Sequence, residues 1–149
     1  MIRILTPGIG ATVQDLGRRG YANIGIGCSG AMDRRALRVA NVLLGNADGA
    51  AGIESTLGGL SFEALEPVTI ALAGADTGAT LDGRPLPRWW VCSLLPGQVL
   101  RMGHSRTGMR GYIAIAGGFE VPEVLDAESQ QPVPFAKLVH LTVESFTVD

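Results

Sequence analysis

The stretch G-I-G-C-S-G-A-M-D-R-R-A-L-R-V-A-N-V-L-L-G-N, residues 25–46, decides the fold of this chain of 149 residues. Its apolar residues recur at the spacing of one helical face: Ala36, Leu37, Ala40, Leu43 and Leu44. Ser29 or Asp33 can cap the helix start, because a short side-chain oxygen accepts a hydrogen bond from a free N–H group there, and Gly45 suits the helix end. The pattern predicts one main helix at about residues 31–44, whose apolar face must pack against a sheet or barrel.

On both sides of this helix, the sequence has the pattern of short strands separated by tight turns. Glycine supplies 21 of the 149 residues, about twice the usual share. Apolar and polar residues alternate over residues 51–57 and again over 60–65, and Asp82-Gly83 is a strong hairpin signal. About nine strands and one helix predict a mostly β fold, an antiparallel barrel or sandwich.

Composition excludes several classes of partner. The net charge is −2 and the 12 basic residues are scattered, so we expect neither nucleic acid nor a membrane surface as a partner. No apolar run approaches the ~20 residues of a membrane span, and the N-terminal residues lack the pattern of a signal peptide, so we expect a cytoplasmic protein. Cys28 and Cys92 have no C-x-x-C partner and no histidine at metal-ligand spacing, which predicts free thiols and no metal site.

Two short motifs suggest chemistry that the strand pattern does not support. Residues 25–30 match the dinucleotide fingerprint G-x-G-x-x-G, and Glu54 follows Gly30 by 54 − 30 = 24 residues. No further alternation of strands and helices follows, however, as a dinucleotide-binding fold requires. Residues 27–31 approach the nucleophile elbow G-x-S-x-G, but that site needs a parallel sheet, so Ser29 is better interpreted as a helix cap.

Other polar residues allow two interpretations each. In residues 14–18, an amide, a carboxylate and a guanidinium lie in one glycine-bent loop, which is either a site or an Asp-capped turn with a surface arginine. Asp76 is either a turn former or a carboxylate in a cleft. Arg110 either pairs with a carboxylate or binds an anionic ligand. Trp89-Trp90 places one indole on each side of a strand, so we expect at least one to pack inside.

Six sequence blocks together resemble one family. They are T-V-Q-D-L-G-R-R-G-Y (12–21), S-G-A-M-D (29–33), A-N-V-L-L-G-N (40–46), I-E-S-T-L-G-G (53–59), I-A-L-A-G-A-D (70–76) and A-I-A-G-G-F-E-V-P-E-V-L (114–125). In this order they resemble the biotin-dependent carboxyltransferase family, also called allophanate hydrolase subunit 2. That family includes the C component of bacterial 5-oxoprolinase, the A/B half of the urea carboxylase carboxyltransferase domain, and antagonists of a sporulation-kinase inhibitor.

The resemblance implies a cyclophilin-like antiparallel β-barrel in a cytoplasmic subunit. It implies a partner similar to allophanate hydrolase subunit 1 (the B component of 5-oxoprolinase) and an ATP-dependent reaction on a cyclic amide or ureido substrate. If the assembly is a carboxyltransferase, the resemblance also implies biotin on a carrier domain. ATP would belong to the assembly, and no cofactor is expected on this chain alone. The family motifs carry over six candidate catalytic residues: Gln14, Asp15, Arg18, Ser29, Asp33 and Asp76.

The resemblance ends at Leu125. Residues 1–125 resemble the first half of a carboxyltransferase A/B subunit, whereas residues 126–149 replace the expected Gly-Ser-Arg-Ser-Thr continuation with a divergent tail. We therefore expect a truncated subunit, and the sequence does not decide whether it is active by itself. An interface that the missing half would cover could also lead to self-association. The alternative is a non-catalytic regulatory or partner-binding module of the same family.

Overall fold

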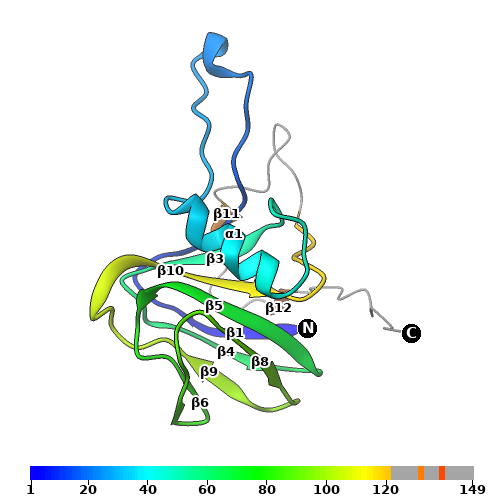
Figure 1. The fold of residues 1–149 in the computed structure, drawn as a ribbon, viewed down its shortest axis with the longest axis vertical. Helices are drawn as coiled ribbons and strands as arrows, with labels where there is room; N and C mark the ends of the chain where they lie inside the picture. The colour runs from blue at the N-terminus through cyan, green and yellow to red at the C-terminus, as the bar shows by residue number, and fades with distance from the viewer. Residues whose placement is uncertain (122–130, 133–137, 140–149) are drawn as a thin grey trace.

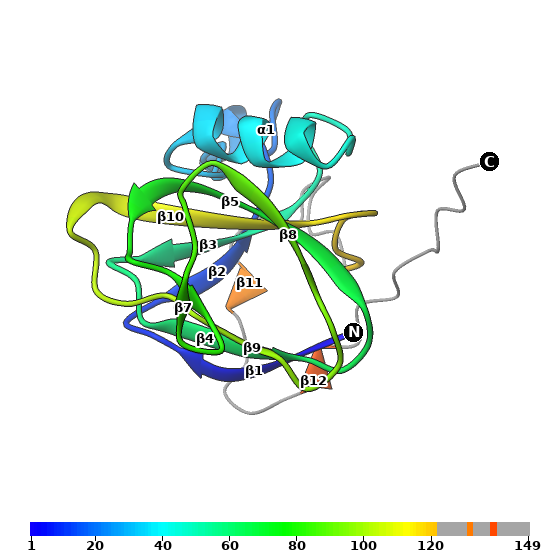
Figure 2. The same ribbon diagram turned by 60° about the horizontal axis from the view of Figure 1, so that its bottom comes forward.

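A computed structural model describes residues 1–121, 131–132 and 138–139, which form two antiparallel sheets and one α-helix. The first sheet has the order β12 (Leu138–Val139), β1 (Ile2–Pro7), β4 (Leu60–Ala64), β9 (Val99–Arg101), β6 (Thr80–Leu81) and β7 (Arg84–Pro85). The second has the order β11 (Gln131–Pro132), β2 (Ala11–Gln14), β3 (Gly52–Thr56), β10 (Thr107–Ile115), β5 (Val68–Asp76) and β8 (Trp90–Leu94). The sheets face each other around one interior (Figure 2).

These sheets confirm the predicted mostly β fold with one main helix. Within the described residues, the ladders remain two separate six-stranded sheets and no ladder joins them into one closed barrel. The predicted hairpin at Asp82-Gly83 connects β6 to β7, and both turn residues have positive φ angles, 48° and 80°. In the segment predicted as a tail, β11 pairs with β2 and β12 pairs with β1.

The core lies between the two sheets. Its largest fully buried aliphatic and phenylalanine side chains come from strands of both sheets: Ile2, Ile4, Leu60, Phe62, Ile70, Leu94, Leu100, Ile113 and Ile115. Side chains point alternately to the two faces of a strand, so the outer face of the second sheet is left to be covered by another element.

Helix α1 (Arg34–Leu43) covers that outer face (Figure 1). Its buried Ala36, Leu37 and Ala40 pack against small residues of β5 and β10. The prediction that Leu43 lies on the buried face is wrong, because the helix ends there and Leu43 is exposed. The buried position belongs instead to Asn41, whose Nδ2 donates to the Ala50 carbonyl over 2.7 Å.

The helix begins three residues later than the predicted start at residue 31. Asp33 is the cap, since its Oδ1 accepts a hydrogen bond from the Ala36 N–H over 3.0 Å. Ser29 does not cap the helix, because its Oγ accepts from the Arg18 guanidinium and its backbone has a φ of 55°. Of the two predicted caps, the structure selects Asp33.

A buried carboxylate holds the helix start against the sheet. Tyr112 on β10 donates its hydroxyl hydrogen to Glu54 Oε2 on β3 over 2.7 Å and accepts from the Asp33 N–H over 2.7 Å. The Met32 N–H also donates to Glu54 Oε2, over 2.8 Å. Burial, together with the hydrogen bond to Glu54, raises the pKa of Tyr112, so the phenol stays protonated and remains a donor.

Between β2 and α1 the chain leaves the sheets as a long arm, residues 15–31 (Figure 1). Backbone hydrogen bonds close its base: the Ala31 N–H donates to the Asp15 carbonyl and the Arg18 N–H to the Cys28 carbonyl, each over 2.8 Å. Gly30 permits this close approach, because a Cβ there would lie 2.6 Å from the Gly17 nitrogen. Farther out, the arm carries the 3-10 helix η1 (Ala22–Ile24), which has no buried residue.

We expect Asp33→Ala to lower the free energy of unfolding by about 1 kcal/mol, because the Ala36 N–H loses its acceptor. Asp33→Asn is the matched control, since an asparagine side chain caps nearly as well. Urea unfolding of the three proteins checks this. An equal loss of stability in both variants would contradict the capping role.

Tyr112→Phe should lower the free energy of unfolding by about 1–3 kcal/mol, because it leaves buried polar groups without a partner. It should also change the alkaline response. A raised folded-state pKa means that the unfolded state releases the phenolic proton first, so this contribution to stability is present below about pH 10 and lost as pH rises above it. Urea midpoints measured between pH 8 and 11 should fall more steeply for the parent than for the variant, and parallel slopes would contradict this account.

Candidate functional site

A groove opens where the arm leaves the second sheet. Its volume is about 700 Å³. Strands β2, β3 and β10, the returning segment of the arm and the first residue of α1 supply its polar lining, which consists of Thr12, Gln14, Ser29, Arg34, Glu54, Thr56 and Arg110. We call this the polar groove. It contains two of the six predicted site residues, Gln14 and Ser29.

Gln14 ends β2 and is 6% exposed. Its Nε2 donates to Thr12 Oγ1 over 2.9 Å. Its Oε1 is buried and has no hydrogen-bond partner among the described residues. A buried carbonyl oxygen without a donor costs about 1–3 kcal/mol, so this atom is a natural acceptor for a ligand N–H.

Arg34 and Arg110 both bring positive charge to the polar groove, and Arg110 is the one held by an ion pair. Its Nη1 lies 3.3 Å from Glu54 Oε1 and hydrogen-bonds to Thr56 Oγ1. Its Nε is buried without a partner among the described residues. Glu54 is 4% exposed, so its charge depends on Arg110, Tyr112 and the Met32 N–H for compensation. The predicted alternative in which Arg110 pairs with a carboxylate is confirmed.

Asp15 and Arg18 shape the base of the arm. Asp15 Oδ1 accepts from the Gly17 N–H over 2.6 Å, as in an Asp-capped turn. The Arg18 guanidinium donates to Ser29 Oγ over 2.8 Å and to the Gly27 carbonyl over 3.3 Å, which ties the two sides of the arm together. Of the amide, carboxylate and guanidinium in residues 14–18, only the Gln14 amide borders the polar groove.

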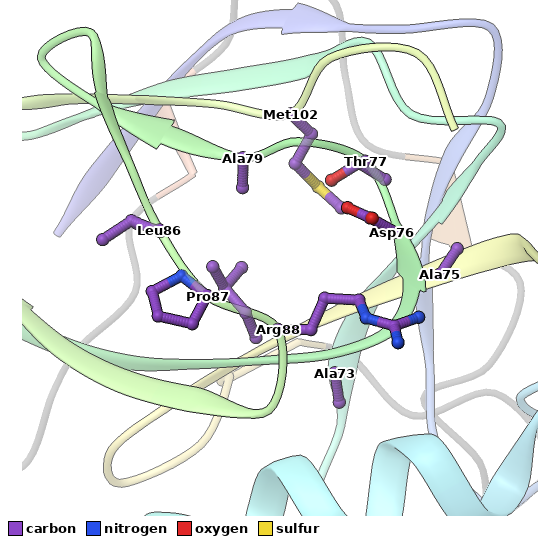
Figure 3. Close-up of a pocket in the computed structure, with 10 residues that line it drawn as sticks. Ala73, Ala75, Asp76, Thr77, Ala79, Leu86, Pro87, Arg88 and Met102 are labelled. Carbon is purple, nitrogen blue, oxygen red and sulfur yellow. The ribbon is translucent and has the colours of Figure 1, made fainter. Parts of the chain in front are cut away.

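Asp33 and Asp76 border other hollows. Asp33 lies beside a pocket of about 320 Å³, which it shares with Arg88, Trp89 and Arg110, and which we call the shelf pocket. Asp76 lines a smaller pocket together with Arg88 and Met102 (Figure 3). Asp76 Oδ1 accepts from the Gly78 N–H over 3.1 Å, so it forms a turn and also borders a cleft. The turn interpretation of Asp76 is confirmed, and its role as a cleft carboxylate stays a prediction.

The tryptophan pair departs from expectation. Trp89 is 41% exposed and Trp90 is 53% exposed, so the prediction that at least one packs inside is wrong. The reason is topological, because β8 ends the strand order of the second sheet and Trp89 precedes it with a φ of 56°.

The two competing motifs do not form their sites. Residues 25–30 lie on the arm and every ladder among the described strands is antiparallel, which rules out the dinucleotide fold. A Ser–His–Asp arrangement is absent from the described residues, since Ser29 borders the polar groove, Asp76 borders the pocket of Figure 3, and His104 forms a backbone bridge with Gly58.

Several remaining expectations concern thiols, metals and membranes. Cys28 and Cys92 are both free, as predicted. Within the described ranges, no three His, Cys, Asp or Glu side chains are grouped as metal ligands. In the same part of the chain, no helix has the length and apolar character to cross a bilayer.

Sequence reasoning missed the central roles of Glu54 and Tyr112. The only available signal was a glutamate in a strand whose other positions were apolar or small, a pattern that also fits a solvated face. What distinguishes the two cases is α1 and the segment before it, which cover Glu54.

Comparison with known proteins agrees with the fold and the sequence blocks. The family model described as carboxyltransferase domain, subdomain A and B, matches residues 24–134. The chain is 40% identical over 127 residues to the C component of 5-oxoprolinase from Haemophilus influenzae, covering 85% of this chain and 41% of that protein. It is 37% identical over 129 residues to urea amidolyase of Saccharomyces cerevisiae, covering 86% of this chain and 7% of that protein.

A solved structure shares the whole fold. The crystal structure of the K. lactis urea amidolyase matches with a TM-score of 0.89 and 28% identity over 99% of this chain and 10% of that one. The present chain thus spans about two fifths of the 5-oxoprolinase component that it matches. The matched residues, the relatives and the shared fold place this chain in the family of carboxyltransferase domains of the subdomain A and B type.

Proposed function

We propose that this chain acts within an ATP-dependent assembly of the 5-oxoprolinase or biotin-dependent carboxyltransferase kind, and that its polar groove binds an amide or ureido group. The named relatives support the type of assembly. We propose that its other members include a partner similar to allophanate hydrolase subunit 1 (the B component of 5-oxoprolinase). We further propose a cytoplasmic location and a cyclophilin-like barrel for residues 1–125 with a divergent tail at 126–149. The coverage of 41% of the H. influenzae protein leaves room for a second half that completes the site.

One observation supports an amide or ureido group as the ligand. Two residues that line the polar groove each carry a buried atom without a partner among the described residues: Gln14 has the acceptor Oε1, and Arg110 has the donor Nε. An amide or ureido group presents an N–H donor next to a carbonyl acceptor, which is the complementary pair. Binding such a group would satisfy both protein atoms, whereas a hydrocarbon would leave both unsatisfied.

The charge of Arg110 suits the chemistry of such a group. When a nucleophile adds to an amide carbonyl, negative charge develops on the oxygen, and a preorganised cation nearby stabilises it. Arg110 is preorganised because Glu54 and Thr56 hold its Nη1. In this proposal the substrate carbonyl accepts from Arg110 Nε, and the substrate N–H donates to Gln14 Oε1.

The other candidate residues take positioning roles. Ser29 borders the polar groove and is oriented by Arg18, while Asp15 shapes the turn from which Arg18 extends. We retain Asp33 and Asp76 as proposed cleft residues of the complete assembly, since each already borders a pocket.

The polar groove suits the ureido ring of biotin, whereas residues 25–30 do not offer the phosphate-binding turn that ATP would use. The ureido ring of biotin has N–H groups beside a carbonyl, so Gln14 and Arg110 would hold it, and biotin on a carrier domain supplies the carboxyl group. The glycines of residues 25–30 belong to the arm and do not form a phosphate-binding turn between a strand and a helix. We therefore assign ATP to another part of the assembly.

A second candidate function is partner binding without catalysis. The exposed end of the arm favours it, because η1 has no buried residue and Ile24 is 64% exposed. Exposed arginines surround the arm and the start of α1: Arg19, Arg34, Arg35 and Arg38. An apolar tip within a basic surface is suited to a partner that offers an apolar pocket with an acidic rim.

Gln14→Met should weaken binding of 5-oxoproline or urea about tenfold without lowering the melting temperature, because it removes one ligand hydrogen bond and also a buried unsatisfied oxygen. Isothermal titration of the chain with its subunit-1-like partner, together with thermal melts, measures both effects.

Gln98→Met is the matched control, since Gln98 donates to Asp82 and accepts from the Leu95 N–H on another part of the surface. It should lower the melting temperature and leave ligand affinity unchanged. Unchanged ligand affinity in Gln14→Met, whatever its melting temperature, would exclude the substrate role of Gln14.

For partner binding, Ile24→Asp should reduce capture of a subunit-1-like partner at least tenfold while leaving the melting temperature unchanged, because Ile24 makes no buried contact within the described part of this chain. Ile9→Asp is the control, since Ile9 is similarly exposed but lies outside the arm. Pull-down of the co-expressed partner measures the effect. Equal capture by all three proteins would exclude the arm from the interface.

A further inference from the structure

We propose that the shelf pocket is a second ligand site, which binds a planar organic carboxylate. It is separate from the amide-binding role proposed for the polar groove and can be tested without turnover. Its walls come from the start of α1, the ends of β5 and β10, and the segment that precedes β8. Its volume of about 320 Å³ lies within the range of small-molecule sites, roughly 300–1,000 Å³.

Charge is the first argument. Arg88 is exposed and makes no hydrogen bond or ion pair with any described residue, so its whole guanidinium is available. Arg110 also lines the shelf pocket and adds a second positive charge to its wall. Asp33 is the one acidic residue among the described lining residues, and its Oδ1 is occupied in capping α1. The balance of charge favours an anion.

Shape is the second argument. In Figure 3 the Arg88 side chain extends away from Pro87, toward the side where Ala75 lies, and Ala75 borders the shelf pocket as well as the pocket drawn there. The Arg88 side chain therefore borders both hollows, and its exposed guanidinium can reach a ligand in the shelf pocket. A planar guanidinium forms two parallel hydrogen bonds with a carboxylate, which sets the orientation of the ligand.

The third argument is an aromatic platform held in a costly backbone conformation. Trp89 lines the shelf pocket with a φ of 56°, which is a rare conformation for a bulky residue and costs about 1–2 kcal/mol. Met109, another exposed apolar residue, lines it too. An indole face and a thioether favour a flat ring. Together with Arg88, they specify a ring that carries a carboxylate.

The chain provides its own reporter for a test. Trp89 and Trp90 are its only tryptophans, so Trp90→Phe leaves Trp89 as the single source of tryptophan fluorescence. Titration with benzoate should change this emission in a saturable way. Benzamide, which has the ring without the charge, and inorganic phosphate, which has charge without the ring, should each bind at least tenfold more weakly.

Two variants locate the site. Arg88→Gln in the Trp90→Phe background should weaken benzoate binding at least tenfold, whereas Arg84→Gln, a neighbouring exposed arginine that lines none of the described pockets, should not. Trp89→Gly should abolish binding in ligand-observed NMR and keep or raise the melting temperature, because glycine adopts the positive φ without strain.

Each other outcome overturns the proposal. Equal binding of phosphate would show a general anion site, and equal binding of benzamide would show an apolar surface. Equal loss in both arginine variants would show an effect of net charge. A Trp89→Gly protein that binds benzoate as tightly as its parent would exclude the platform.

Discussion

The buried carboxylate of Glu54 is the constraint on which the rest of the molecule depends. A charge that is 4% exposed needs compensation, and its partners come from separate parts of the chain. The hydroxyl of Tyr112 and the guanidinium of Arg110 extend from β10, and the Met32 N–H extends from the segment before α1. Satisfying one carboxylate therefore sets the helix start, the return path of the arm and the orientation of a cation.

That arrangement explains why the polar features gather on the outer face of the second sheet. The inner face is filled by the core, while α1 covers the outer face through alanine contacts with β5 and β10. Beyond the helix start the sheet is uncovered, and the polar groove and the shelf pocket lie there on either side of Arg110. One side chain thus borders both hollows, and its Nη1 is held by the same glutamate that holds the helix.

The arm gives the fold a second, outward role. Its base is closed by backbone hydrogen bonds and by glycines whose backbones touch, whereas its outer end buries none of the residues of η1. The exposed Ile24 of this outer end is the basis of the partner-binding proposal above. The relatives that this chain matches are about twice its length or far longer.

Local sequence by itself determined the elements whose cause is local. Alternation and turn chemistry predicted strands over residues 51–57 and 60–65, where β3 and β4 lie, and the hairpin at Asp82-Gly83, and helical spacing predicted α1. Gln14 was singled out by its sequence context, which resembles the family. The tertiary structure alone decided that Asp33 rather than Ser29 caps the helix, that Leu43 and both tryptophans are exposed, and that Glu54 is the hub. The physical reason is that burial and hydrogen-bond partners come from residues far apart in the chain, and Glu54 and Tyr112 are 58 positions apart. Local patterns carry no information about which distant strand or helix will cover a given side chain.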